Sequence, residues 1–131
     1  MLKLKSLKEP PSKEDGLRIM IARYGIRGQK KEYRQWDQWK DEGWKELAPS
    51  PALLREYIKH KKISWDEYVV KYTLEIKSNP KALEALSRLK LLIATRTITI
   101  LCHCRDDKHC HRSIIKQMIE DEDSKRLFLP Q

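Results

Sequence analysis

The sequence is poor in asparagine, phenylalanine and glycine, has an odd number of cysteines, and contains no long apolar run. Its 131 residues include four glycines, three cysteines, one phenylalanine and a single asparagine, Asn79. Three cysteines cannot all pair within one chain, which excludes a complete disulfide framework. No apolar run approaches the roughly 20 residues of a membrane-spanning helix, and the first residues lack the apolar centre of a secretory signal. We therefore expect a cytoplasmic protein with reduced cysteines and no membrane partner.

Charge is present in excess. Lysine and arginine total 28 against 19 aspartate and glutamate residues, and 36% of the chain is charged, where about 25% is usual. The net charge of +9 favours an anionic partner, either a phosphate-bearing ligand or nucleic acid. Acidic residues are interspersed among the basic ones, however, so a solvated surface explains any single basic group more simply. The many charged side chains and the scarce asparagine also resemble the composition of thermophile proteins.

Two segments have the pattern of short buried strands. Residues 17–24 and 96–103 are rich in β-branched and apolar side chains, and polar or turn-forming stretches bound them. Apolar and polar residues alternate over residues 1–7, which predicts a further strand at a sheet edge. Residues 126–130 are another candidate strand.

Helix-start signals separate the two strand-like segments. Ser50 and Asn79 each precede a proline, as an N-cap precedes proline at the first helical position. Residues 64–67 match a capping box, and a last helix begins near residue 110. Strands that alternate with helices favour parallel pairing. The sequence therefore predicts a small single α/β domain over residues 1–131, with a mostly parallel sheet flanked by helices in a Rossmann-like arrangement.

All three cysteines and three of the four histidines lie within residues 97–120. Zinc could take Cys102, Cys104 and two residues of the run 109–111, but Cys-x-Cys is a tighter spacing than structural zinc sites use. A strand also turns His103 away from both of these cysteines. We therefore expect no metal and no cofactor, and we interpret Cys102 as a small apolar side chain on a buried strand.

The run Cys110-His111-Arg112 at the predicted helix start favours thiol chemistry. Backbone amides and the positive end of a helix stabilise a thiolate there. His111 could act as acid or base, and Arg112 could hold an anion. Cys104 would support Cys110 as a second thiol, and a reversible disulfide between these two is a further interpretation. Packing at a strand-to-helix junction explains the same residues without chemistry.

Several stretches together resemble one known family. They are DGLRIMIARYGIRGQKK at 15–31, KELAPSPALLREYIKH at 45–60, WDEYVVKYTLEI at 65–76 and TITILCHCRDDKHCHRSII at 97–115. Over about residues 10–120 the chain is similar to the domain of unknown function 488 family. The resemblance implies a compact α/β fold of cytoplasmic prokaryotic proteins and does not itself assign an activity.

Two motifs of that family fall near the predicted strand ends. The family's Asp-Arg-Leu-Trp-Pro-Arg-Gly corresponds to residues 22–28, which keep Arg23, Arg27 and the final glycine but lack the acid, the tryptophan and the proline. The Cys-x5-Cys-His-Arg loop of longer members matches Cys104 through Arg112. The chain therefore resembles a short member that carries the cysteine loop of the longer ones.

Both motif loops follow strands, and ligands of parallel α/β sheets lie at the carboxyl ends of the strands. We expect one basic crevice there, formed by anion-binding Arg23, Arg27 and Arg112, catalytic Cys110 and His111, and the supporting thiol Cys104. The predicted function is binding of a phosphate-bearing or nucleic-acid ligand, with thiol chemistry at Cys110. The alternatives are a non-catalytic structural or protein-interaction module, with the Trp-rich segment 33–44 as its contact surface, and a zinc-binding domain.

Overall fold

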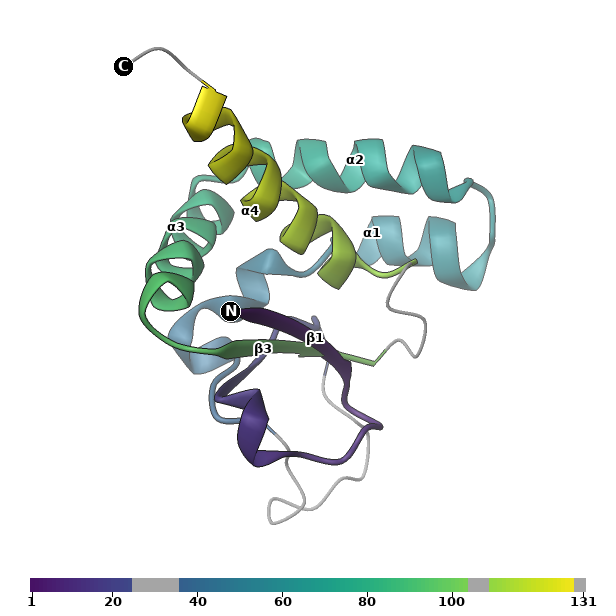
Figure 1. Ribbon diagram of the computed structural model, residues 1–131. Helices are drawn as coiled ribbons and strands as arrows, with labels where there is room; N and C mark the ends of the chain where they lie inside the picture. The colour runs from purple at the N-terminus through teal and green to yellow at the C-terminus, as the bar shows by residue number, and fades with distance from the viewer. Residues whose placement is uncertain (25–35, 104–108, 129–131) are drawn as a thin grey trace.

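The structure, a computed structural model, describes residues 1–24, 36–103 and 109–128, with side chains through residue 121 (Figure 1). Three strands form one parallel sheet: β1 (Leu2–Ser6), β2 (Leu17–Met20) and β3 (Ile98–Cys102). Their order is β1–β3–β2, so β3 is central and β1 is an edge strand, as predicted. The predicted small α/β fold with a parallel sheet is confirmed.

The helices begin where the capping signals predict. Ser50, Ser64 and Asn79 each accept a hydrogen bond from a backbone amide of the helix that follows. The helices are α1 (Pro51–Leu54), which continues as the π-helical turn η5 (Arg55–Lys59), then α2 (Trp65–Lys77), α3 (Pro80–Thr95) and α4 (His111–Phe128). The strand proposed for residues 126–130 was wrong, because α4 continues to Phe128 and its backbone groups bond within the helix.

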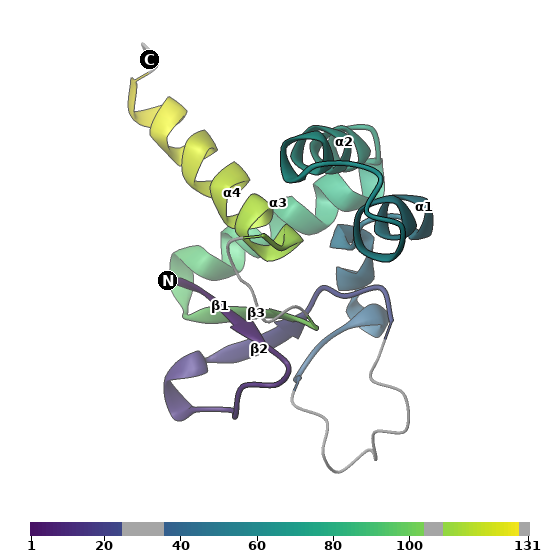
Figure 2. The ribbon, with the colours of Figure 1, turned by 90° about the vertical axis from the view of Figure 1, so that its right-hand side faces the viewer.

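The four α-helices lie on one side of the sheet, as Figure 2 shows. The main core fills the space between them and includes Ile98 and Ile100 of β3 together with Tyr72 of α2. Alternation turns Met20 and Leu101 to the opposite face, where Trp36 and Trp39 pack against their cluster. Those two rings meet edge to face, with centroids 5.4 Å apart.

Two tryptophans of the Trp-rich segment, Trp39 and Trp44, pack into the fold. Trp44 is fully buried in the 3₁₀ turn η4 (Trp44–Leu47), and Trp39 donates from its indole nitrogen to the carbonyl of Ala22. Within the described ranges, no helix combines the length and the apolar character that crossing a bilayer would need.

Candidate functional site

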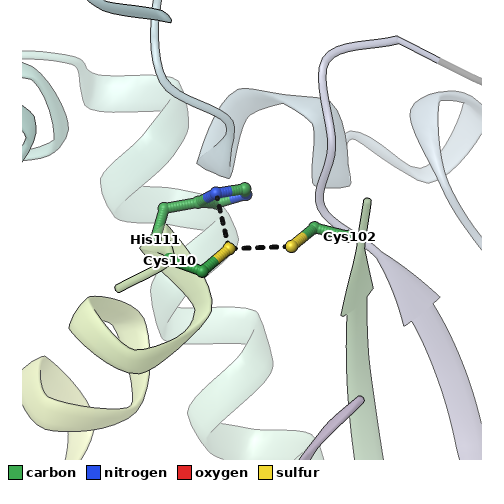
Figure 3. Close-up of side chains that lie close together, drawn as sticks. All are labelled: Cys102, Cys110 and His111. Atoms are coloured by element: carbon green, nitrogen blue, oxygen red, sulfur yellow. Dashed lines mark hydrogen bonds between the residues drawn. The ribbon is translucent and has the colours of Figure 1, made fainter. Parts of the chain in front are cut away.

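The carboxyl end of β3 faces the first residues of α4, and three buried side chains meet there (Figure 3). Cys102 is the last residue of β3, Cys110 directly precedes α4, and His111 is the first residue of α4. The two Sγ atoms are 2.8 Å apart, and Sγ of Cys110 is 3.5 Å from Nδ1 of His111. We refer to these three residues as the thiol cluster.

The backbone just after β2 determines which ring nitrogen carries the hydrogen when the His111 imidazole is neutral. Nε2 of His111 is 3.0 Å from the carbonyl oxygen of Ile21. A carbonyl oxygen only accepts hydrogen bonds, so Nε2 carries the proton, and Nδ1 of the neutral ring keeps its lone pair toward Cys110. The imidazole is therefore oriented to accept the proton of the Cys110 thiol.

Tyr72 packs against the thiol cluster as a neutral side chain. Its ring meets that of His111 edge-on, with centroids 5.8 Å apart, and its hydroxyl donates to the carbonyl oxygen of Leu47. Burial raises the pKa of Tyr72 well above its ordinary value, and the nearby Tyr68 and Cys110 raise it further. The phenol therefore stays protonated over the pH range in which thiols ionise.

A pocket of about 100 Å³ opens beside the thiol cluster, and all three cluster residues line it. Other walls come from the segment after β2 and from the helices. Tyr57 and Tyr68 supply stacked rings with centroids 4.5 Å apart. The lining, mostly apolar with a few convergent polar groups, resembles that of small-ligand sites, while the volume is smaller than the roughly 300–1,000 Å³ of sites that enclose a drug-sized molecule.

Arg23 lies at this pocket, at the sheet edge where it was predicted. Its Nε donates to the carbonyl oxygen of Pro49 at 2.7 Å, and one Nη donates to that of Ala48 at 3.4 Å. A guanidinium has five N–H donors. The contacts made within the described part of the chain therefore leave donors that an anion in the pocket could use.

Two histidines also border the pocket. Nε2 of His103 contacts the carbonyl oxygen of Tyr24. The His109 ring lies edge-on to that of Trp65, with centroids 5.2 Å apart. The residues on either side of the 104–108 segment thus reach the same pocket from the ends of β3 and α4.

The structure brings together some of the predicted site residues and not others. Arg23, Cys110 and His111 share the pocket, whereas Arg112 is fully buried and is not among the residues that line it. A role for Arg112 as an anion contact stays a prediction. Arg27 and Cys104 lie outside the described residues.

Cys102 lines the pocket, although the sequence did not mark it as a candidate site residue. It is buried, as predicted, but its sulfur faces Cys110 instead of serving only to pack the strand. The alternation of side chains along the strand could have indicated this position, because it places Cys102 on the same strand face as Ile98 and Ile100. The main core on that face includes Ile114 of the last helix. A helix that packs there places its first residues beside Cys102.

The thiol cluster is also a possible ligand set for a soft metal ion. Its Sγ and imidazole nitrogen atoms all lie within 4.8 Å of one another. Zinc binds cysteine and histidine, and a histidine ligand usually donates its other ring N–H to a carbonyl, as His111 does to Ile21. The same atoms could therefore serve as a thiol–imidazole pair, as a dithiol or as three metal ligands.

The chain matches one family model over residues 2–123, nearly its whole length. That model is described as the active DUF488-N3 subclade, DUF488-N3a. No curated protein and no solved structure matches the chain. The matched range includes β1, the thiol cluster and most of α4. The chain therefore belongs to the domain of unknown function 488 family, as the resemblance of its motifs predicted.

Proposed function

We propose that the pocket binds a phosphate-bearing ligand, free or as part of a nucleic acid, and that Cys110 provides thiol chemistry beside it. One observation carries the proposal: Cys110 and its His111 partner line the same small pocket as Arg23. A nucleophile, a proton acceptor and an anion contact thus converge on one volume. The description of the matched subclade as active accords with a chemical role.

Cys110 has two features that favour a reactive thiolate. It directly precedes the 18-residue helix α4, whose amino end stabilises negative charge. Nδ1 of His111 lies 3.5 Å from its sulfur and can accept the thiol proton. A substrate in the pocket would therefore meet a nucleophile with a base beside it.

The pocket also suits a ligand that carries both an anion and an apolar part. Arg23 supplies planar N–H donors that match phosphate oxygens. Tyr57 and Tyr68, which stack on each other, add apolar ring surface to the pocket lining. The net charge of +9 adds long-range attraction for any anion.

Alkylation with iodoacetamide tests both parts of the proposal. The rate of modification of Cys110 is read from the tryptic peptide 109–112, with and without inorganic phosphate or AMP. We expect labelling at neutral pH in the free protein, slowed on the order of tenfold at ligand concentrations well above the Kd. Labelling that begins only at the pH of an ordinary thiol, with no protection by either probe, would contradict the proposal.

Arg23→Ala separates the anion contact from the thiol. Loss of a charged hydrogen bond costs about 1.5–3 kcal/mol, so we expect phosphate or AMP to bind roughly ten- to a hundredfold more weakly. Labelling of Cys110 without ligand stays close to that of the wild type. Arg55→Ala, at an exposed position of η5, is the matched control and keeps full affinity.

A zinc-binding role is the second candidate, because Cys102, Cys110 and His111 place three suitable ligand atoms together. Its test is the zinc content of protein purified without chelator. About one zinc per chain, lost in Cys102→Ser and retained in the exposed-site variant His60→Gln, would favour this function over the first.

A further inference from the structure

Cys102 and Cys110 face each other from two fixed elements. Cys102 ends the central strand, which is paired on both sides with β1 and β2. Cys110 is held at the start of α4, where its carbonyl oxygen accepts from the amide and the hydroxyl of Ser113. The sulfur atoms are 2.8 Å apart. A disulfide needs about 2.05 Å, so closure requires the sulfurs to move by less than about 1 Å.

The pocket gives a small molecule access to this pair. Both cysteines line it, although each side chain is almost completely buried. A volume of about 100 Å³ admits a small oxidant, whereas a disulfide on the surface of another protein cannot approach sulfurs so deeply placed. Nδ1 of His111 contacts the Cys110 sulfur at 3.5 Å and can accept its proton, which marks Cys110 as the sulfur that attacks first.

We propose that Cys102 and Cys110 form a two-electron redox couple whose oxidant is a small hydroperoxide. The Cys110 thiolate attacks the outer oxygen of the peroxide, the O–O bond breaks, and the alcohol or water leaves after taking up a proton. The resulting Cys110 sulfenic acid condenses with the Cys102 thiol, which forms the S–S bond and releases water. In sum, two thiols and one hydroperoxide give one disulfide, one alcohol and one water.

The couple shares the Cys110 thiol with the proposed function but needs no bound anion. Oxidation removes the nucleophile from the pocket, and a low-molecular-weight dithiol restores it by thiol–disulfide exchange, becoming oxidised itself. The disulfide therefore makes the ligand chemistry of the pocket dependent on peroxide.

Thiol counting on the wild-type protein is the first test. Protein is reduced with dithiothreitol, freed of it without air, treated with equimolar hydrogen peroxide, and titrated with Ellman's reagent under denaturing conditions. We expect the three thiols to fall to one. Trypsin then yields peptides 97–105 and 109–112 joined by a disulfide, and fragmentation between residues 102 and 104 assigns the bond to Cys102. A bond from Cys104, or three thiols remaining, overturns the proposal.

Two serine variants sharpen the test. Cys104→Ser is the matched control and still loses two thiols. Cys102→Ser loses one thiol and accumulates a sulfenic acid at Cys110 that dimedone traps, because no resolving thiol is left. Tightly bound zinc on Cys102 and Cys110 that keeps them inert to peroxide also overturns the couple. Should the serine variants fail to fold, the wild-type peptide map still decides. Failure of phosphate to bind leaves this result unchanged, so the two proposals fail separately.

Discussion

At the scale of single residues, His111 connects the Cys110 sulfur to the backbone that follows β2. Its two ring nitrogens face different partners, the Ile21 carbonyl on one side and the Cys110 sulfur on the other. The backbone carbonyl of Ile21, just after β2, therefore orients the imidazole of His111, the first residue of α4. Removal of the imidazole therefore tests its influence on Cys110 without changing the cysteine.

We expect His111→Gln to slow iodoacetamide labelling of Cys110 at neutral pH on the order of tenfold, because the thiol loses its proton acceptor and less of it is thiolate. Glutamine can still donate to the Ile21 carbonyl, which limits the disturbance of packing. The measurement is the rate of modification of peptide 109–112 across a pH series. The exposed-site variant His60→Gln is the control. An unchanged pH profile in His111→Gln would show that the imidazole does not activate Cys110.

Asp15 is a second residue whose surroundings shift its pKa. Its buried carboxylate forms ion pairs with Arg18 and, at 3.1 Å, with Lys5, and it accepts from the Ser12 amide. Burial alone would raise its pKa, but the hydrogen bonds from Ser12 and Lys5 and the neighbouring positive charges outweigh burial. The pKa of Asp15 therefore lies below the ordinary 3.8.

The lowered pKa fixes the sign of a pH effect. Folded protein binds the Asp15 proton less readily than unfolded protein. The ionised Asp15 therefore stabilises the fold above pH 3.8, and this stabilisation is lost as the pH falls through the folded-state pKa. We expect Asp15→Asn to lower the free energy of unfolding at neutral pH by about 3 kcal/mol, and to lose less stability on acidification than the wild type. Urea unfolding at several pH values measures both, with exposed Glu14→Gln as the control. Equal acid dependence in wild type and Asp15→Asn would be the contrary result.

At the scale of elements, local signals predicted more than long-range ones. Ser50, Ser64 and Asn79 marked their helices correctly because an N-cap acts within one turn. The placement of β3 between β1 and β2 could not be predicted from the sequence, since it depends on pairing between segments about 80–95 residues apart. The Cys102–Cys110 contact depends on the same long-range packing, which is why Cys102 was interpreted as packing alone.

The turn between η1 (Lys13–Asp15) and β2 contains the tightest backbone approach among the glycines of the described chain. Gly16 has φ of 64° and ψ of −136°, and a Cβ there would lie 2.2 Å from the carbonyl oxygen of Thr97. That oxygen already accepts from the Leu17 amide at the start of the β2–β3 pairing. Only glycine fits this position without moving β3.

We expect Gly16→Ala to lower the free energy of unfolding by about 3 kcal/mol or more, through both the clash and the unfavourable dihedral angles. Gly43→Ala is the matched control, since Gly43 also has a positive φ of 82° but its Cβ would meet only the flexible end of Arg88, at 3.3 Å. That substitution costs about 1 kcal/mol. Urea unfolding of both variants gives the comparison, and equal losses would rule out the close approach as the cause.

At the scale of the whole molecule, the parallel sheet gathers residues from distant segments at one edge. Arg23 after β2 and Cys110 before α4 meet at one pocket, as the rule for parallel sheets predicts. Arg112 differs although it is only two residues from Cys110, because two positions along a helix turn a side chain through more than half a turn. The helix start was predictable from the sequence, whereas the side of α4 that faces the pocket was not.

The net charge of +9 gives the whole molecule an attraction for polyanions that does not depend on the pocket. We expect a short DNA duplex to bind at low ionic strength and to lose about a hundredfold in affinity between roughly 50 and 200 mM salt, as for about four phosphate contacts. Fluorescence anisotropy over a salt series measures the slope of log K against log salt.

Arg23→Ala decides whether a phosphate of the nucleic acid enters the pocket. If it does, the slope falls by about one unit relative to the wild type, whereas exposed Arg55→Ala measures the effect of losing surface charge alone. Equal slopes in the two variants would assign the binding to the surface. If no duplex or single strand binds at low salt, the nucleic-acid form of the ligand is excluded, and only a free phosphate-bearing molecule remains for the pocket.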